Sequence, residues 1–145
     1  MIEILNRELT DHEFSRMKEG FDEHTLDNGV MVQEADRFTF VAEKKTIFVG
    51  TASGLAYKNG ESYAGWFYLT DLFVEKSYRG KGWGGKLLRL LEQEISQVGV
   101  QHIWTWTAGY ESPSFYEKQG YHVFTSFENW YSDGSARVGF RKRLF

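Results

Sequence analysis

Four glycines stand between a strand-like apolar run and an amphipathic helix, in the stretch from residue 69 to residue 91. They occupy positions 80, 82, 84 and 85, so the backbone N–H groups of this turn are not shielded by side chains. The positive end of the helix lies beside them, and Arg79 and Lys81 add formal charge. These residues predict a site for an anionic group such as a phosphate.

Two common kinds of phosphate loop fit these glycines poorly. A Walker loop has Gly-Lys followed by a Ser or Thr that binds magnesium, whereas Gly85-Lys86 is followed by Leu87. Three of the glycines match the dinucleotide fingerprint, but that loop leaves its strand almost at once and sits in a repeated βαβ layout. Here residues 75–79 intervene and antiparallel hairpins come first. An NTPase and a dinucleotide-binding fold are therefore both disfavoured.

The elements around this loop are predicted from turn signals and hydrophobic periodicity. A capping box at Thr10 and Glu13 opens a helix that runs through Phe21. Helices are also predicted at residues 84–98 and 112–119, and strands at residues 2–5, 38–43, 47–57, 63–74, 102–107, 121–131 and 136–144.

The strand at residues 63–74 is apolar at both parities, with Trp66 and Leu72 at even positions and Phe67 and Leu69 at odd ones. This pattern predicts a central strand. The strand at residues 102–107 is expected to return parallel to it by a right-handed crossover. The predicted fold class is α/β, with a mixed, mostly antiparallel sheet flanked by helices. The phosphate loop would join the fourth strand to the following helix, in one domain spanning residues 1–145.

Composition excludes several classes of protein. With 17 basic and 20 acidic residues, the net charge of -3 does not favour a general nucleic-acid or anionic-membrane binder. The absence of cysteine excludes disulfides and a cysteine nucleophile, and without His-x-x-x-His spacing no metal site is expected. No apolar run is long enough to span a bilayer and no signal peptide is evident, so a cytoplasmic protein is expected.

A second motif, Ser-Pro-Ser-Phe-Tyr-Glu-Lys-Gln-Gly-Tyr, occupies residues 112–121. It resembles a signature of the GNAT N-acetyltransferase superfamily, and Arg79, Gly82 and Gly84 match that family's acyl-CoA loop, Arg/Gln-x-x-Gly-x-Gly/Ala. The order of elements is also similar, so the resemblance covers nearly the whole chain. The chain departs from the family at Gly109, where an Asn that contacts the pantetheine arm is common.

This resemblance implies that the chain binds acetyl-CoA and that an amine of the acceptor attacks the thioester directly. The protein would position the reactants, deprotonate the amine and stabilise the departing thiolate. The backbone of Phe73 and Val74 would pair with the pantetheine amides. The pyrophosphate would be held by Arg79, Gly80, Lys81, Gly82, Trp83 and Gly84.

Two residues are predicted to be catalytic. Tyr116 takes the place of the family's tyrosine that points at the CoA sulfur, so the resemblance implies a general acid; packing beside Phe115 is the alternative interpretation. Asp71 lies in the apolar strand, where burial would raise its pKa and suit it to be the general base. Its alternative is a hydrogen-bonded structural carboxylate, and Glu111 is the second candidate for the base.

The sequence does not identify the acceptor, and three hypotheses are compatible with it. The first hypothesis is a primary amine of a small molecule, the second is an N-terminus or lysine of a protein, and the third is a non-catalytic acyl-CoA sensor. A homodimer could form through the edge of the C-terminal strand. Six aromatic residues could line an acceptor pocket: Tyr63, Trp66, Tyr68, Trp106, Tyr110 and Trp130.

Overall fold

The computed structural model describes every residue from Met1 to Phe145, and the chain divides into two units, residues 1–33 and residues 34–145. A single domain over residues 1–145 stays a prediction. None of the helices is both long and apolar enough to cross a membrane.

The first unit contains one helix, α1 (Asp11–Asp27). Thr10 caps it as predicted, because its hydroxyl accepts a hydrogen bond from the Glu13 N–H at 3.2 Å and the Glu13 carboxylate accepts one from the Thr10 N–H at 2.9 Å. The Arg7 guanidinium binds the same carboxylate, and these hydrogen bonds lower the pKa of Glu13 to about 2. The strand predicted at residues 2–5 is wrong, since these residues form no regular secondary structure.

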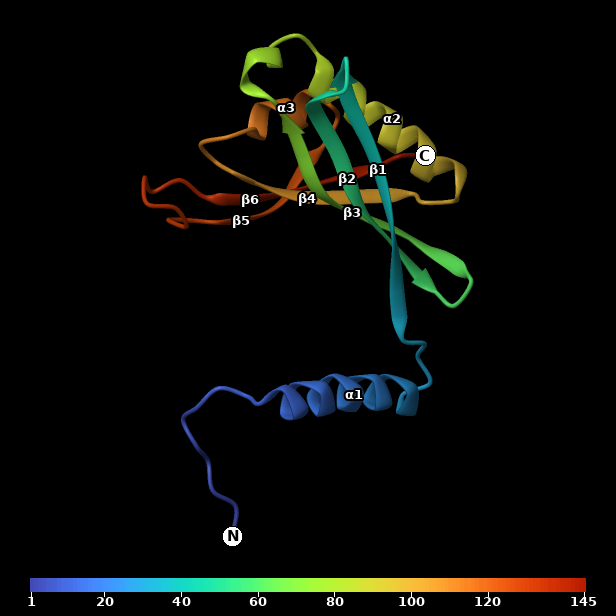
Figure 1. Cartoon of the computed structure of the whole chain (residues 1–145), viewed down its shortest axis with the longest axis vertical. Coiled ribbons are helices and arrows are strands. Elements are labelled where there is room, and N and C mark those ends of the chain that lie inside the picture. Colours follow the sequence, from blue (N-terminus) through green and yellow to red (C-terminus); the bar gives the residue numbers. More distant parts are fainter. The chain divides into compact units, whose positions relative to one another are not determined.

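The second unit is built on a six-stranded sheet in the order β1-β2-β3-β4-β6-β5 (Figure 1). Strands β3 and β4 pair in parallel, whereas the β2–β3, β4–β6 and β5–β6 pairs are antiparallel. The strands are β1 (Gln33–Lys44), β2 (Ile47–Asn59), β3 (Ser62–Val74), β4 (His102–Ala108), β5 (His122–Phe127) and β6 (Arg137–Arg143). The helices are the short 3-10 helix η1 (Lys76–Tyr78), α2 (Trp83–Gln97) and α3 (Pro113–Lys118).

This topology confirms the predicted mixed, mostly antiparallel sheet, and the glycine loop joins β3 to α2 as expected. Because residues 2–5 add no strand, the strand predicted to be fourth is the third. It is central, with β2 on one side and β4 on the other.

A β-bulge at Thr70 reverses the side-chain alternation of β3. The register with β2 shifts there, so Thr70 is an extra residue on β3. Before the bulge, the odd-numbered Phe67 and Leu69 are fully buried. After it, the even-numbered Leu72 and Val74 pack against the same core. The even-numbered residues of this strand therefore do not all lie on one face.

Helices α2 and α3 contribute to one core on one face of the sheet. Four residues of α2 are buried there with residues of β4, β6 and α3: Leu87, Leu88, Leu91, Ile95, Ile103, Phe140 and Tyr116. On β4, Ile103, Thr105 and Thr107 are buried. Since strand side chains alternate, Trp104 and Trp106 point to the opposite face of the sheet. We call this opposite face, with its aromatic side chains, the aromatic face.

Candidate active site

Strands β3 and β4 separate partway along their length. Their parallel register ends at Tyr68 and Trp104 after three positions. Just beyond, the Thr105 hydroxyl donates a hydrogen bond to the Leu69 carbonyl oxygen at 2.9 Å. β3 then continues to Val74 with no strand paired on that side. We call this region, in which β3 and β4 are no longer paired, the split.

Main-chain groups of alternate β3 residues point into the split. The Glu75 N–H donates to a carbonyl oxygen of β2 at 2.7 Å. Because an antiparallel pair alternates, the main chain of Phe73 also faces β2, whereas that of Leu72 and Val74 faces the split. Of the two residues predicted to contact pantetheine, Val74 therefore faces the split and Phe73 does not.

The loop between β3 and α2 relies on glycine at two positions. Gly80 and Gly82 have φ values of +75° and +86°, a region that other residues rarely adopt. Gly82 is the N-cap of α2, and no side chain caps that end of the helix. Trp83 begins the helix, with its ring 5.5 Å from the Lys86 ammonium. The first N–H groups of α2 lack intrahelical partners and lie at its positive end, as an anion site requires.

The cations of this loop are held by neighbouring groups. Arg79 donates from Nε to the Val74 carbonyl oxygen at 2.8 Å, and its guanidinium lies 5.7 Å from the Phe73 ring centroid. The Lys81 ammonium lies 5.8 Å from the Tyr78 ring. Neither cation forms an ion pair with a carboxylate. Both charges are therefore available to an anion at the end of α2.

Two further glycines of the predicted motifs lie on the borders of this site. Gly84, on α2, is close to α3, because a Cβ there would lie 3.6 Å from the Phe115 ring, in ordinary contact. Gly109 follows β4 and donates its N–H to the Ala136 carbonyl oxygen at 2.7 Å. A Cβ at Gly109 would lie 3.2 Å from that oxygen, so a larger residue here would require the Ala136 backbone to move by a few tenths of an ångström.

Tyr116 lies at the point where the strands separate. Its side chain is 5% exposed, and its ring contacts those of Phe115, Tyr121 and Phe140. Burial raises the pKa of Tyr116 to about 12, opposed by a hydrogen bond with the Thr105 side chain. Thr105 is also the residue whose hydroxyl meets Leu69 where the split begins. Tyr116 is therefore both a core residue and a protonated phenol at the split.

Asp71 is not buried as its prediction required. Its side chain is 62% exposed, accepts a hydrogen bond from the Thr70 hydroxyl at 2.7 Å and lies 3.9 Å from Arg37. The bulge at Thr70 is the reason, since it turns Asp71 from the core to the aromatic face. Glu111, the second candidate for the base, is also exposed, and its charge contributes to the raised pKa of Tyr116.

The aromatic face contains a groove of about 440 Å³, lined by Trp66, Trp104, Trp106, Phe124 and Arg141. Trp66 and Trp106 were among the six aromatic residues predicted to line a pocket. Trp104, Phe124 and Arg141 were missed, although the alternation along residues 102–107 indicates that Trp104 and Trp106 share a face.

The other four predicted aromatic residues do not line this groove, and each contacts another side chain. Tyr63 packs against the core and donates its hydroxyl to Asp36 at 2.7 Å. Tyr68 stacks on Trp104 at 4.2 Å between ring centroids. Tyr110 and Trp130 contact the rings of Tyr131 and Phe127, respectively.

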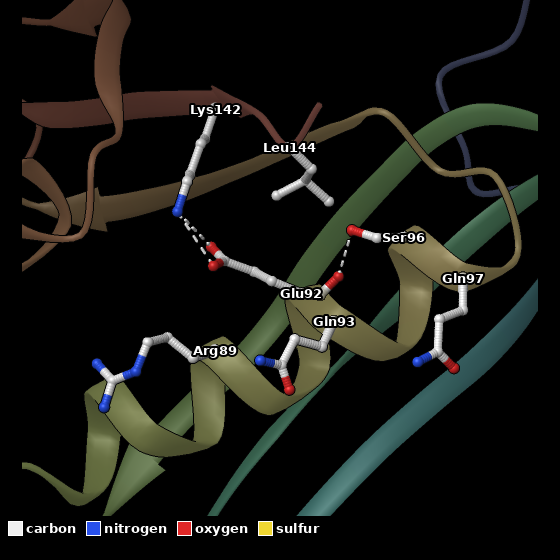
Figure 2. Close-up of a pocket in the computed structure, with 7 residues that line it drawn as sticks. All are labelled: Arg89, Glu92, Gln93, Ser96, Gln97, Lys142 and Leu144. Carbon is white, nitrogen blue, oxygen red and sulfur yellow. Dashed lines mark hydrogen bonds and ion pairs between the residues drawn. The ribbon is translucent and has the colours of Figure 1, made fainter.

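A second cavity of about 440 Å³ lies between α2 and the end of β6, lined by Arg89, Glu92, Gln93, Ser96, Gln97, Lys142 and Leu144. Figure 2 shows Lys142 extending from β6 to Glu92 on α2, with Nζ 3.1 Å and 3.2 Å from the carboxylate oxygens. Glu92 is 8% exposed, and it also accepts a hydrogen bond from the Tyr121 hydroxyl at 2.7 Å. Burial and this carboxylate raise the pKa of Tyr121. The contacts connect α2 to β6 and to the segment after α3.

We expect Glu92→Ala to lower the free energy of unfolding by about 3 kcal/mol, because it leaves the Tyr121 hydroxyl and the Lys142 ammonium without their shared carboxylate. Glu92→Gln keeps an acceptor for Tyr121 and should cost about 1 to 2 kcal/mol. Urea unfolding measures both. Glu94→Ala, at an exposed position of the same helix, is the control and should change stability by less than about 0.5 kcal/mol. Equal stability of Glu92→Ala and Glu94→Ala would contradict this account.

Comparison with known proteins identifies relatives of this chain. Residues 1–121 match the model of the acetyltransferase (GNAT) family. An L-ornithine N5-acetyltransferase from Arabidopsis thaliana is 29% identical over 99 residues, which are 64% of this chain and 42% of that protein. The chain thus spans less than half the length of this relative.

Solved structures share the fold. An acetyltransferase from Bacillus cereus matches with a TM-score of 0.78 and 21% identity, over 97% of both chains. An aminoglycoside 6'-N-acetyltransferase complexed with coenzyme A matches with a TM-score of 0.63 and 20% identity, over 94% of this chain and 82% of that one.

Proposed function

Since the chain belongs to the GNAT acetyltransferase family, we propose that it moves an acetyl group from acetyl-CoA to a primary amine of a small molecule. The observation that carries this proposal is the combination of the split, the uncapped end of α2 and the phenol of Tyr116. The split would hold the pantetheine arm, the end of α2 the pyrophosphate, and Tyr116 the sulfur. No group of His, Asp or Glu side chains suited to a metal ion accompanies them.

The residues of the split and loop fit acetyl-CoA chemically. The pyrophosphate would bind the N–H groups at the start of α2, with the loop from Arg79 to Gly84 around it and charge from Arg79 and Lys81. The pantetheine amides would pair with the main chain of Leu72 and Val74, much as a neighbouring strand would. Bound acetyl-CoA supplies the thioester that the amine attacks.

Tyr116 acts as a hydrogen-bond donor to the developing thiolate. With a pKa of about 12 it is protonated at neutral pH. A thiol has a pKa of about 8.5, so the phenol is the weaker acid of the two. Tyr116 therefore stabilises the thiolate through its hydrogen bond, and the proton that neutralises the sulfur comes finally from water or from the amine.

The acceptor approaches from the aromatic face, opposite the helices that would hold acetyl-CoA. Trp104 and Trp106 line the groove on this face. Asp71 is turned to the same face by the bulge, and its exposed carboxylate accepts the amine proton through water. A groove of about 440 Å³ suits a small molecule. The alternatives are a protein acceptor and a non-catalytic acyl-CoA sensor, and the experiment below distinguishes both from a small-molecule acceptor.

The test is a calorimetric titration with acetyl-CoA, followed by an amine panel with detection of free thiol. Saturable binding together with thiol release on a small amine would support the proposal. Binding without thiol release on any amine or peptide would indicate a sensor, and no binding at millimolar acetyl-CoA would overturn the acetyl-CoA assignment. A cytoplasmic location and a homodimer stay predictions, which fractionation and sedimentation would test.

A further inference from the structure

The guanidinium of Arg137 is held by two indole rings and by no carboxylate. It lies 5.0 Å from the Trp106 ring centroid and 5.3 Å from that of Trp130. Arg137 is half-buried, and it forms no ion pair and no side-chain hydrogen bond. A guanidinium carries five N–H donors in a planar fork, and groups of this kind are normally satisfied when they leave water.

The ring contacts fix the Arg137 side chain in a position from which it can bind an anion. Indole rings attract a cation through their faces, which leaves the N–H edges of the guanidinium open. These edges match a carboxylate, which can accept two parallel hydrogen bonds from them. Because Trp106 and Trp130 restrict the side chain beforehand, little conformational entropy remains to be lost on binding.

Arg137 also lies close to the reacting centre. Its residue on β6 pairs with Ala108, the last residue of β4, along the part of β4 that borders the split. Thr105, where the split begins, is three residues earlier on β4. With a rise of about 3.3 Å per residue and a strand spacing of about 4.8 Å, the two backbone positions are about 11 Å apart. The guanidinium contacts the ring of Trp106, which lies between Thr105 and Ala108 on β4.

A second cation on the same face is less well placed. The Arg141 guanidinium lies 5.3 Å from the Trp66 ring, and its residue pairs with Trp104, before the split begins. Arg141 is also exposed. It lines the groove, but its guanidinium is held over Trp66, on the part of β3 that is still paired with β4, whereas that of Arg137 is held over Trp106, beside the split.

We propose that Arg137 binds a carboxylate on the acceptor, so that the acceptor is an amino acid or a similar amine with an acidic group, and not a simple polyamine. This inference rests on the proposed acetyl transfer and adds a substrate class to it. The amine attacks at the split, and the carboxylate binds the edge of Arg137 beside Trp106.

The test compares amino acids with the amines left when their carboxylate is removed, namely ornithine with putrescine and lysine with cadaverine. For the native chain, kcat/KM for the preferred amino acid should exceed kcat/KM for the matching diamine by about 10- to 100-fold. This ratio corresponds to one charge-assisted bidentate contact. Arg137→Gln should remove this preference by raising KM for the amino acid, while kcat/KM for the diamine stays close to native. Arg137→Lys should restore part of the preference, because it keeps the charge and loses the fork.

Arg143→Gln is the matched control. Arg143 is an exposed arginine at the end of the same strand, and it donates from Nε to the Phe145 carbonyl oxygen at 2.8 Å. The Arg143→Gln variant should leave the preference for the amino acid unchanged. The affinity of each variant for acetyl-CoA shows whether that variant is folded. Equal kcat/KM for the amino acid and the diamine of each pair would overturn the inference and leave the proposed acetyl transfer standing. An equal loss of kcat/KM for both substrates in Arg137→Gln would do the same. If acetyl-CoA binds and no amine releases thiol, acetyl transfer fails and the inference with it.

Discussion

Gly82→Trp is expected to weaken acetyl-CoA binding by about 100-fold or more. Gly82 is the N-cap of α2, with a φ of +86°, and a Cβ there would point into open space with no atom within 4 Å. In the proposed complex this space holds the pyrophosphate, so an indole ring would cover the N–H groups that bind it. Two lost charge-assisted hydrogen bonds of about 1.5 kcal/mol each account for a change of this size.

Gly99→Trp separates occlusion of the site from backbone strain. Gly99 follows the same helix at its other end, has a φ of +92°, and a Cβ there also has no atom within 4 Å. Both substitutions force a side chain onto a left-handed residue, which costs about 1 to 2 kcal/mol of stability. Calorimetric titration should show loss of affinity in Gly82→Trp alone. Native affinity in Gly82→Trp would remove the loop from the acetyl-CoA site.

Tyr116→Phe is expected to lower kcat by about 100-fold and to leave acetyl-CoA affinity nearly unchanged. The phenylalanine ring keeps the contacts with Phe115 and Phe140, and only the hydroxyl at the split is lost. The expected loss of kcat is at the lower end of the rate enhancements typical of general acid catalysis. The reason is that a phenol with a pKa of about 12 stabilises a thiolate by hydrogen bonding more than by proton transfer. Stopped assays of thiol release at saturating acetyl-CoA measure the loss.

The pH dependence of kcat provides a second readout of Tyr116. An ordinary tyrosine ionises near about pH 10. The pKa of Tyr116 is raised to about 12, so its protonated form persists and kcat should not fall from its ionisation below about pH 10. The neutral form is the one favoured by folding, and its contribution to stability is therefore complete below about pH 10 and lost between there and about pH 12.

Tyr121→Phe is the control for Tyr116→Phe. Tyr121 is also a buried phenol, and its ring centroid lies 5.5 Å from that of Tyr116, but its hydroxyl binds Glu92 away from the split. This variant should lose stability and keep kcat close to native. If Tyr116→Phe and Tyr121→Phe lower kcat equally, the role of Tyr116 is packing, the alternative that the sequence left open.

Local features of the fold could be predicted because short segments of chain decide them. The capping box at Thr10 and Glu13 needs only residues three apart, and it forms as expected. Gly80 and Gly82 adopt left-handed backbone conformations for which glycine has no steric penalty. The motif around Tyr116 likewise sits on a short helix where the spacing indicated one. The family followed from these features, since two motifs and the order of elements agreed.

Register and burial could not be predicted in the same way, because they depend on pairing between distant segments. One extra residue at Thr70 is enough to turn Asp71 out of the core, and the register with β2 directs Leu72 and not Phe73 into the split. Glu92 looks like an exposed helix residue until Tyr121 and Lys142, far along the chain, enclose it.

The sequence by itself indicated the family, by the resemblance of two motifs, and predicted the sheet class and the glycine loop before α2, because turn signals and hydrophobic periodicity are properties of short stretches. Only the tertiary structure decided which groups surround the reacting centre. Trp106 and Arg137 are about 30 residues apart in the chain and meet because β4 and β6 pair side by side. A contact of this kind is a property of the assembled sheet, since neither strand carries a local signal for its partner.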